Sequence, residues 1–204
     1  WPAFDTSGAT SHGDVLGADL KYQFRQWCKD KIVNWADLSD NINPELWQDS
    51  TLTNRPTGNN ITRIPVWNFN SQSSLQELDL HGNQLTSLPA GVFDGLFSLQ
   101  KLFLHNNQIN TIEVGAFAGM ESLHILELQG NKLTSLQDGV FNGLFSLQRL
   151  YLHNNQLTSL PARVFDGLSS LQKLFLFGNP SLTCRPPYPD SVTNYIGPED
   201  VCPS

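Results

Sequence analysis

Residues 75–98 have the sequence LQELDLHGNQLTSLPAGVFDGLFS, and residues 99–122 follow it position by position as LQKLFLHNNQINTIEVGAFAGMES. The 24-residue period continues through the leucines that open each unit, which are Leu75, Leu99, Leu123, Leu147 and Leu171. Apolar residues occupy positions 1, 4, 6, 11, 14, 19 and 22 of a unit, a spacing that fits neither a long helix nor one plain strand. A fixed period in this range predicts a stacked array of similar coils.

Each unit is expected to form a coil whose inside is covered by its neighbours. Leu78 and Leu80 alternate as on a short strand, the chain turns at Asn83, and a looser segment returns through Phe93 and Leu96. Asn recurs at position 9, where its amide can satisfy backbone groups that the turn leaves unpaired, and Phe recurs at position 19. The two predicted internal columns are Asn83, Asn107, Asn131, Asn155 and Asn179, and Phe93, Phe117, Phe141 and Phe165.

This pattern resembles the typical 24-residue leucine-rich repeats of toll-like receptors, extracellular matrix proteoglycans and variable lymphocyte receptors. The resemblance covers about half to two-thirds of the chain and is specific. It implies an α/β solenoid, a leucine-rich repeat horseshoe in which a parallel sheet lines the concave face and binding occurs most often on that face. The C-terminal region has no long inserted loop of the kind that some variable lymphocyte receptors carry, so their antigen-binding mode is not implied.

Composition divides the chain into three predicted regions. Residues 1–50 are expected to form a helical N-terminal cap, which a solenoid needs to cover its exposed apolar end. Residues 51–180 form the solenoid, with a degenerate first coil at 51–74 and regular coils from 75. Residues 181–204 form a proline-rich C-terminal cap. The evidence for the first cap is the set of tryptophans Trp1, Trp27, Trp35, Trp47 and Trp67, together with an apolar helical stripe of Leu16, Leu20, Phe24, Cys28 and Ile32.

The three cysteines predict one disulfide. Cys184 and Cys202 bracket the C-terminal cap, and a bridge between them would close a short loop in a segment without a hydrophobic core; two free thiols are the alternative. Cys28 lies on the apolar stripe of the predicted helix, which favours a buried, inert thiol over an intermolecular bridge or a reactive site. Asn60 begins an N-x-Ser/Thr sequence and is a candidate glycosylation site if the chain is secreted.

Positions 3, 5 and 7 of each coil are expected to point to solvent from the concave sheet. Aromatic side chains become more frequent on this face toward the C-terminal half, and exposed aromatic clusters are typical of binding hot spots. Mutual stacking that stiffens the sheet is the alternative. The candidate partner-binding residues are Phe103, Tyr151, Phe175, Phe177, Lys101, Arg149 and Lys173. At position 23, Phe97 and Phe145 are candidate assembly contacts or loop-packing residues.

The same face does not predict catalysis or a cofactor. His81 and His105 are neighbours in one column, but no cysteine joins them and the column is interrupted, so no metal site is predicted. Asp79 and Glu127 lie on an open face without a pocket that would raise the pKa of one of them. No nucleophile–base pair, phosphate loop or metal motif occurs at a meaningful spacing, so the chain is not expected to be an enzyme.

Charge and hydropathy narrow the expected partners. The net charge is −7, with 12 scattered Lys and Arg residues, which disfavours nucleic acid and anionic membranes, so no nucleic-acid partner is expected. No run of about 18 apolar residues is present, so membrane insertion is not expected. The chain starts at Trp1 rather than Met, as expected after signal-peptide removal or for part of a longer chain.

These observations lead to two hypotheses. The first is a non-enzymatic secreted or cell-surface recognition module that binds a protein or glycan through its concave face. The second is a structural subunit of an extracellular matrix, filament or larger complex. A fold of repeats keeps its core and varies its surface, so the sequence does not name the ligand.

Overall fold

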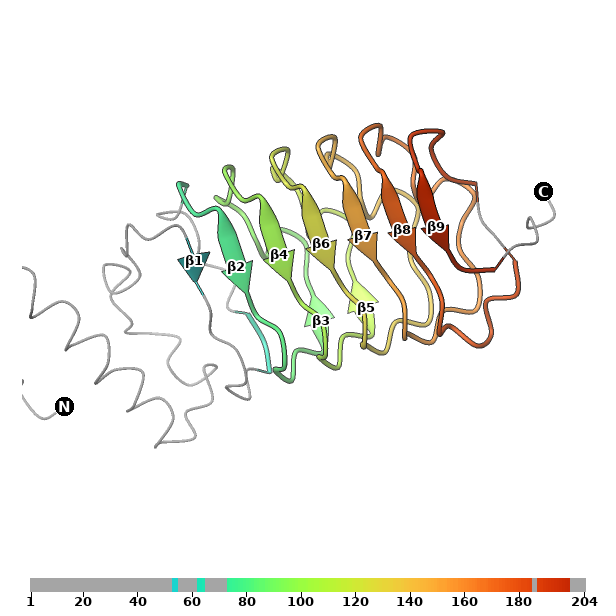
Figure 1. Cartoon of the computed structure of the whole chain (residues 1–204). Coiled ribbons are helices and arrows are strands. Elements are labelled where there is room, and N and C mark those ends of the chain that lie inside the picture. The colour runs from blue at the N-terminus through green and yellow to red at the C-terminus, as the bar shows by residue number, and fades with distance from the viewer. Residues whose placement is uncertain (1–52, 55–61, 65–72, 185–186, 199–204) are drawn as a thin grey trace, which may run out of the picture. The chain divides into compact units, whose positions relative to one another are not determined.

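The computed structural model describes residues 53–54, 62–64, 73–184 and 187–198, which contain nine short strands and turns. Seven strands form one parallel sheet in the order β1-β2-β4-β6-β7-β8-β9 (Figure 1). Its strands are β1 (Thr53–Asn54), β2 (Glu77–Asp79), β4 (Lys101–Phe103), β6 (Ile125–Glu127), β7 (Arg149–Tyr151), β8 (Lys173–Phe175) and β9 (Asn194–Ile196). The returning segments add a second parallel pair, β3 (Ser87–Leu88) and β5 (Thr111–Ile112), which the sequence did not predict.

The register of the sheet confirms the 24-residue period. Leu78 pairs with Leu102, and Leu102 pairs with Leu126, each one full unit along the chain. Thr53 pairs with Glu77 at the same interval, as a coil that starts near Thr51 requires. The parallel solenoid is therefore as predicted, whereas the helical cap, Cys28 and Asn60 lie outside the described residues, and the boundaries of the three regions stay a prediction.

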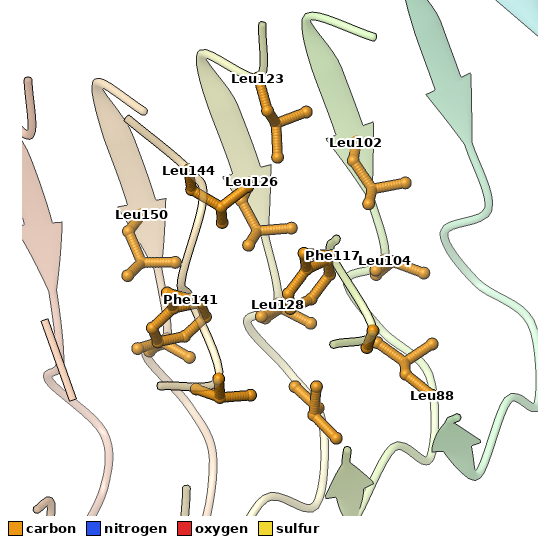
Figure 2. Close-up of a cluster of buried hydrophobic side chains, with 14 of the residues drawn as sticks. Leu88, Leu102, Leu104, Phe117, Leu123, Leu126, Leu128, Phe141, Leu144 and Leu150 are labelled. Carbon is orange, nitrogen blue, oxygen red and sulfur yellow. The ribbon is translucent and has the colours of Figure 1, made fainter. Parts of the chain in front are cut away.

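The core lies between the sheet and the returning segments of the coils (Figure 2). The apolar residues of the repeat are buried at every predicted position of the regular coils; in the first, Leu78, Leu85 and Phe93 are 1%, 0% and 0% exposed. The Phe column packs in parallel, with ring centroids 6.1 Å apart from Phe93 to Phe117 and from Phe117 to Phe141, and 6.2 Å apart from Phe141 to Phe165. A continuous stack of this kind buries apolar surface that a single coil would expose.

The Asn column connects each coil to the one before it. The Nδ2 group of Asn131 donates to the carbonyl oxygen of Leu128 in its own coil at 2.9 Å and to that of Leu104 in the preceding coil at 3.0 Å. Its Oδ1 accepts the backbone N–H of Ile109 at 3.0 Å. The same three contacts recur at Asn107, Asn155 and Asn179. The expected role of this amide is confirmed.

Position 8, at the turn before this column, alternates between glycine and asparagine. Asn106 and Asn154 have φ angles of 55° and 54°, a left-handed conformation that asparagine adopts more readily than most residues. Their Oδ1 atoms lie against Gly130 and Gly178 of the next coil, where a Cβ atom would collide with them. Glycine at position 8 adopts this left-handed conformation without strain and leaves room for the asparagine side chain of the preceding coil.

The last strand, β9, lies in the region predicted to form the C-terminal cap, and the 24-residue period does not predict it. Lys173 pairs with Asn194, 21 residues along rather than 24. Val192 and Tyr195 pack against the core at the places that positions 1 and 4 occupy in a regular coil. The sheet thus continues past Asn179-Pro180, where the repeat pattern ends. Within the described residues, no helix has the length and apolarity to cross a membrane.

Candidate recognition surface

We define the strand face as the side chains at positions 3, 5 and 7 of the coils, which alternate with the buried leucines of the sheet. Because strand residues alternate between two sides, these side chains share the side opposite the core. The N-terminal half of the strand face is on β2, β4 and β6, and the C-terminal half is on β7, β8 and β9.

Acidic residues in the N-terminal half contact basic ones. Glu77 and Asp79 are each 8% exposed, so the expectation that they face solvent is wrong. The Oδ1 atom of Asp79 accepts the backbone N–H of His81 at 3.2 Å and lies 2.6 Å from Nδ1 of the same residue. The ammonium of Lys101 lies 3.2 Å from Oε2 of Glu77. Lys101, a candidate partner-binding residue, is therefore already ion-paired.

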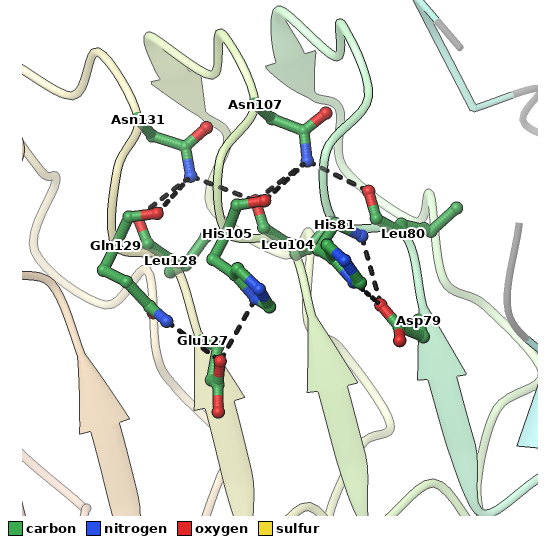
Figure 3. Close-up of polar contacts among 10 residues, drawn as sticks. All are labelled: Asp79, Leu80, His81, Leu104, His105, Asn107, Glu127, Leu128, Gln129 and Asn131. Carbon is green, nitrogen blue, oxygen red and sulfur yellow. Dashed lines mark hydrogen bonds and ion pairs between the residues drawn. The ribbon is translucent and has the colours of Figure 1, made fainter. Parts of the chain in front are cut away.

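Two histidines continue this polar network (Figure 3). The rings of His81 and His105 stack with centroids 4.6 Å apart and planes at 3°. Oε2 of Glu127 lies 3.1 Å from Nδ1 of His105, an ion-pair distance without hydrogen-bond geometry, and accepts Nε2 of Gln129 at 2.9 Å. Among the described residues, no group of three or more His, Cys, Asp or Glu side chains is arranged to hold a metal ion.

Burial on this face makes two histidines harder to protonate. Desolvation lowers the pKa of His105, and the nearby His81 lowers it further, against the attraction of Glu127 and Asp79. Desolvation also lowers the pKa of His153, opposed by Glu127. Both imidazoles therefore take up a proton at a lower pH than an ordinary histidine, whose pKa is near 6.5.

The C-terminal half is formed by aromatic rings in two stacked pairs. Tyr151 and Phe175 stack with centroids 4.9 Å apart and planes at 5°. His153 and Phe177 stack with centroids 4.4 Å apart and planes at 15°. His153 also contacts Phe175 edge-on at 6.4 Å, which joins the pairs into one aromatic cluster of Tyr151, His153, Phe175 and Phe177. Phe177 is 41% exposed.

The structure thus brings together three of the four predicted aromatic residues and separates the fourth. Phe103 pairs in register with Glu127, which in turn pairs with Tyr151, so a carboxylate stands between Phe103 and the aromatic cluster. The ring of Phe103 contacts His105 edge-on at 6.3 Å. His153 is a member that sequence reasoning did not select, although its place in the same column as Phe177 was visible.

Two cations lie beside the aromatic cluster. Arg149 and Lys173 are direct partners in the parallel register, as are Tyr151 and Phe175 two residues further along. Within the part of the chain that the structure describes, neither Arg149 nor Lys173 has an ion pair. Ile196, 46% exposed, pairs with Phe175 and extends the apolar surface onto β9.

The two candidate assembly residues lie away from the strand face, at position 23 of their coils. Phe97 is 61% exposed and Phe145 is 53% exposed. A Cβ atom on Gly119 would lie 3.2 Å from the ring of Phe97, whereas the equivalent place at Gly167 is open space. Phe97 therefore packs over the next coil, and Phe145 does not make the corresponding contact.

Of the other predicted sites, Cys202 and Asn60 lie outside the described residues. Cys184 lies just after the last regular coil and is half-buried. The Cys184–Cys202 bridge and the glycosylation of Asn60 stay predictions.

Comparisons with known proteins agree with this architecture. A family model described as leucine rich repeat matches residues 57–109, 73–133 and 121–180, which together span more than half of the chain. The solved TLR13–ssRNA13 complex contains a chain that is 33% identical over 57% of this one, with a TM-score of 0.55. The Toll–Spatzle complex of Drosophila contains one that is 24% identical over 67%, with a TM-score of 0.61. No curated protein matches the chain.

The present chain spans 17% and 20% of the lengths of those two solved chains. The first comparison corrects one expectation: the exclusion of nucleic acid as a partner is wrong, because a protein with the same kind of repeat was solved in complex with ssRNA13. The net charge misled here because it averages over the whole chain, whereas a ligand on a solenoid contacts one face and meets the local charge.

Proposed function

Since the chain belongs to the leucine-rich repeat family, we propose that it is a non-enzymatic recognition module that binds a protein or glycan through its strand face. We further propose that it acts outside the cell or at the cell surface. The relatives that match its fold were solved as complexes, which supports binding as the role of such a scaffold.

The observation that favours the strand face is the aromatic cluster beside Arg149 and Lys173. A buried core does not require aromatic residues at positions 5 and 7, because the leucines at positions 4 and 6 are already 0% exposed in these coils. Apolar rings that remain partly exposed, next to cations without an ion pair among the described residues, are typical of surfaces that a partner covers.

The alternative is a structural subunit that assembles through its flank. The exposure of Phe145, which makes no contact over Gly167, is the observation that favours it. Phe97, 61% exposed, supports it as well, although part of its ring packs over Gly119.

One experiment separates the two functions. The whole chain is immobilised, partners are captured from extracellular fluid, and a Tyr151→Ala/Phe175→Ala variant is compared with a Phe97→Ala/Phe145→Ala variant. The recognition function predicts that the first variant loses the captured partner and the second retains it, and that the protein is monomeric in dilute solution. Concentration-dependent polymers that the flank variant abolishes would establish the structural role instead.

The cap regions are part of this proposal. We propose a cap at 1–50, a solenoid at 51–180 with its first coil at 51–74, and a cap at 181–204 closed by a Cys184–Cys202 disulfide. Peptide mapping without reduction is expected to find that bridge, with Cys28 as the thiol that titrates after denaturation, and three titratable thiols would contradict both the bridge and secretion. Expression in secreting cells tests Asn60 by the mass of an attached glycan.

A further inference from the structure

We infer that the C-terminal half of the strand face recognises a segment of a partner protein in which acidic side chains lie next to an apolar one. The inference rests on the proposed function and narrows its ligand from a protein or glycan to one class of peptide.

The first argument is the balance of charge on the strand face. Each acidic side chain of the N-terminal half already has a basic or polar neighbour: Glu77 has Lys101, Asp79 has His81, and Glu127 has His105 and Gln129. Arg149 and Lys173, which are neighbours in the sheet, form no ion pair with an acidic side chain among the described residues. Their strands are about 4.8 Å apart, so a carboxylate from outside could contact both cations.

The second argument is the orientation of the rings. Tyr151 lies face to face with Phe175, and His153 with Phe177, so each pair covers its own inner faces. The stack therefore presents mostly ring edges to solvent. Ring edges are the positive side of the aromatic quadrupole and attract carboxylate oxygens, while their C–H groups contact apolar side chains. Nucleobases stack on open ring faces, and a ligand of that type would have to use the outer rings.

The third argument is the layout of the two surfaces. The cations are at position 3 of β7 and β8, the Tyr151–Phe175 pair is at position 5 of the same strands, and Ile196 continues the apolar row on β9. A ligand must therefore place its carboxylates to one side of its apolar group. A short peptide with acidic residues flanking a Leu, Phe or Trp has that arrangement.

The test is selection of a random peptide library, displayed on yeast, against the whole chain. The selected peptides are expected to combine Asp or Glu with an aromatic or aliphatic residue. Arg149→Glu/Lys173→Glu is then compared with Lys132→Glu/Arg163→Glu, which changes the net charge equally but on residues outside the strand face. We expect at least about a tenfold loss of affinity in the first variant, about 1.4 kcal/mol, and little change in the second.

A charge exchange makes the test specific to this pairing. Peptides in which the acids are replaced by lysine are expected to bind the Arg149→Glu/Lys173→Glu variant better than the unchanged chain. Equal loss in both charge variants would overturn the inference, because it would show an effect of net charge alone. Selected peptides without acidic residues, or no selected peptides at all, would also overturn it.

The same assay separates this inference from the proposed function. A single-stranded RNA oligonucleotide that binds the unchanged chain and is lost in Tyr151→Ala would overturn the peptide inference and leave recognition by the strand face intact. Selected peptides whose binding is lost only in the Phe97→Ala/Phe145→Ala variant would overturn both the peptide inference and the proposed function.

Discussion

The two halves of the strand face have the same backbone and different chemistry. In the N-terminal half, acids, histidines and one lysine contact one another, as in the network from Asp79 to Glu127. In the C-terminal half, Arg149 and Lys173 lie beside the aromatic cluster and form no ion pair with any residue that the structure describes. Both halves rest on the same buried columns, so the difference is confined to three positions of each coil.

This comparison separates what holds the solenoid together from what it presents. Polar groups that contact one another have little left to offer a ligand, because a partner would have to replace interactions that exist already. A ligand that contacts Arg149, Lys173 or the partly exposed rings does not have to replace such interactions. The surface chemistry can therefore change from coil to coil without any change in the packing beneath it.

The comparison assumes that both halves of the strand face rest on one common core, and a substitution in that core is expected to have the largest effect. Phe141→Ala is expected to reduce the free energy of unfolding by about 3–5 kcal/mol, because it leaves a cavity between Phe117 and Phe165 in the middle of the stack. Urea denaturation measures the loss. Gln129→Ala, on the strand face of the same coil, is the control and is expected to change it by less than about 0.5 kcal/mol. Equal effects of the two substitutions would mean that the assigned register is wrong.

The junction of the two halves depends on Asn155. Its amide donates to Leu128, in the last coil of the N-terminal half, and accepts from Leu133 of that coil. Asn155→Ala leaves the buried N–H of Leu133 without this acceptor and removes one of the two donors to the carbonyl of Leu128, which keeps Asn131. We expect a loss of about 2–3 kcal/mol in unfolding free energy. Asn142→Ala, an exposed asparagine, is the matched control. An equally small effect at both positions would show that water replaces the amide.

The difference in ligand binding is tested by one aromatic residue from each half. Tyr151→Ala is expected to weaken binding of a selected peptide or captured partner by about 2 kcal/mol, because the aromatic cluster loses a stacked ring. Phe103→Ala, separated from the cluster by Glu127, is expected to have a much smaller effect. Calorimetric titration measures both. Similar losses would mean that the ligand covers both halves, and the division proposed here would be abandoned.

The smallest expected effect is the dependence of the unfolding free energy on pH. Because the pKa of His105 is lowered in the folded chain, the unfolded chain takes up the proton first as the pH falls through about 6.5. Folding is then favoured above that pH and weakened progressively below it, toward the lowered pKa. His105→Gln and His153→Gln should each flatten this decline in unfolding free energy. A chain that gains stability on acidification would show that the attraction of Glu127 outweighs desolvation.

Periodicity predicted the buried residues almost completely, because each must fill the same place in successive coils. It missed β9 because the last step is 21 residues, although Val192 and Tyr195 keep the spacing of positions 1 and 4. A search for that spacing without a fixed period would have found the strand.

The strand face was predicted less well, because the side-chain partners there depend on three-dimensional geometry that the aligned repeat sequences do not contain. The separation of Phe103 by Glu127 and the place of His153 in the column of Phe177 were visible in the sequence. The burial of Glu77 and Asp79 and the stacking of His153 on Phe177 were not. These depend on which neighbours each side chain turns toward. The net charge gave a wrong expectation about nucleic acid for a related reason, because it does not show where on the chain the charges lie.

The alternation at position 8 limits how such a chain can change its length. The side chains of Asn106 and Asn154 each occupy space that Gly130 and Gly178 leave open in the following coil. Deleting residues 123–146 alone would bring Asn106 next to Asn154, where the second side chain would collide with the first. Deleting residues 99–146, two coils together, would leave Gly82 before Asn154 with no collision. Loss of coils is therefore tolerated where it brings no two asparagines at position 8 together, as in deletion of residues 99–122 alone, which leaves Gly82 before Gly130.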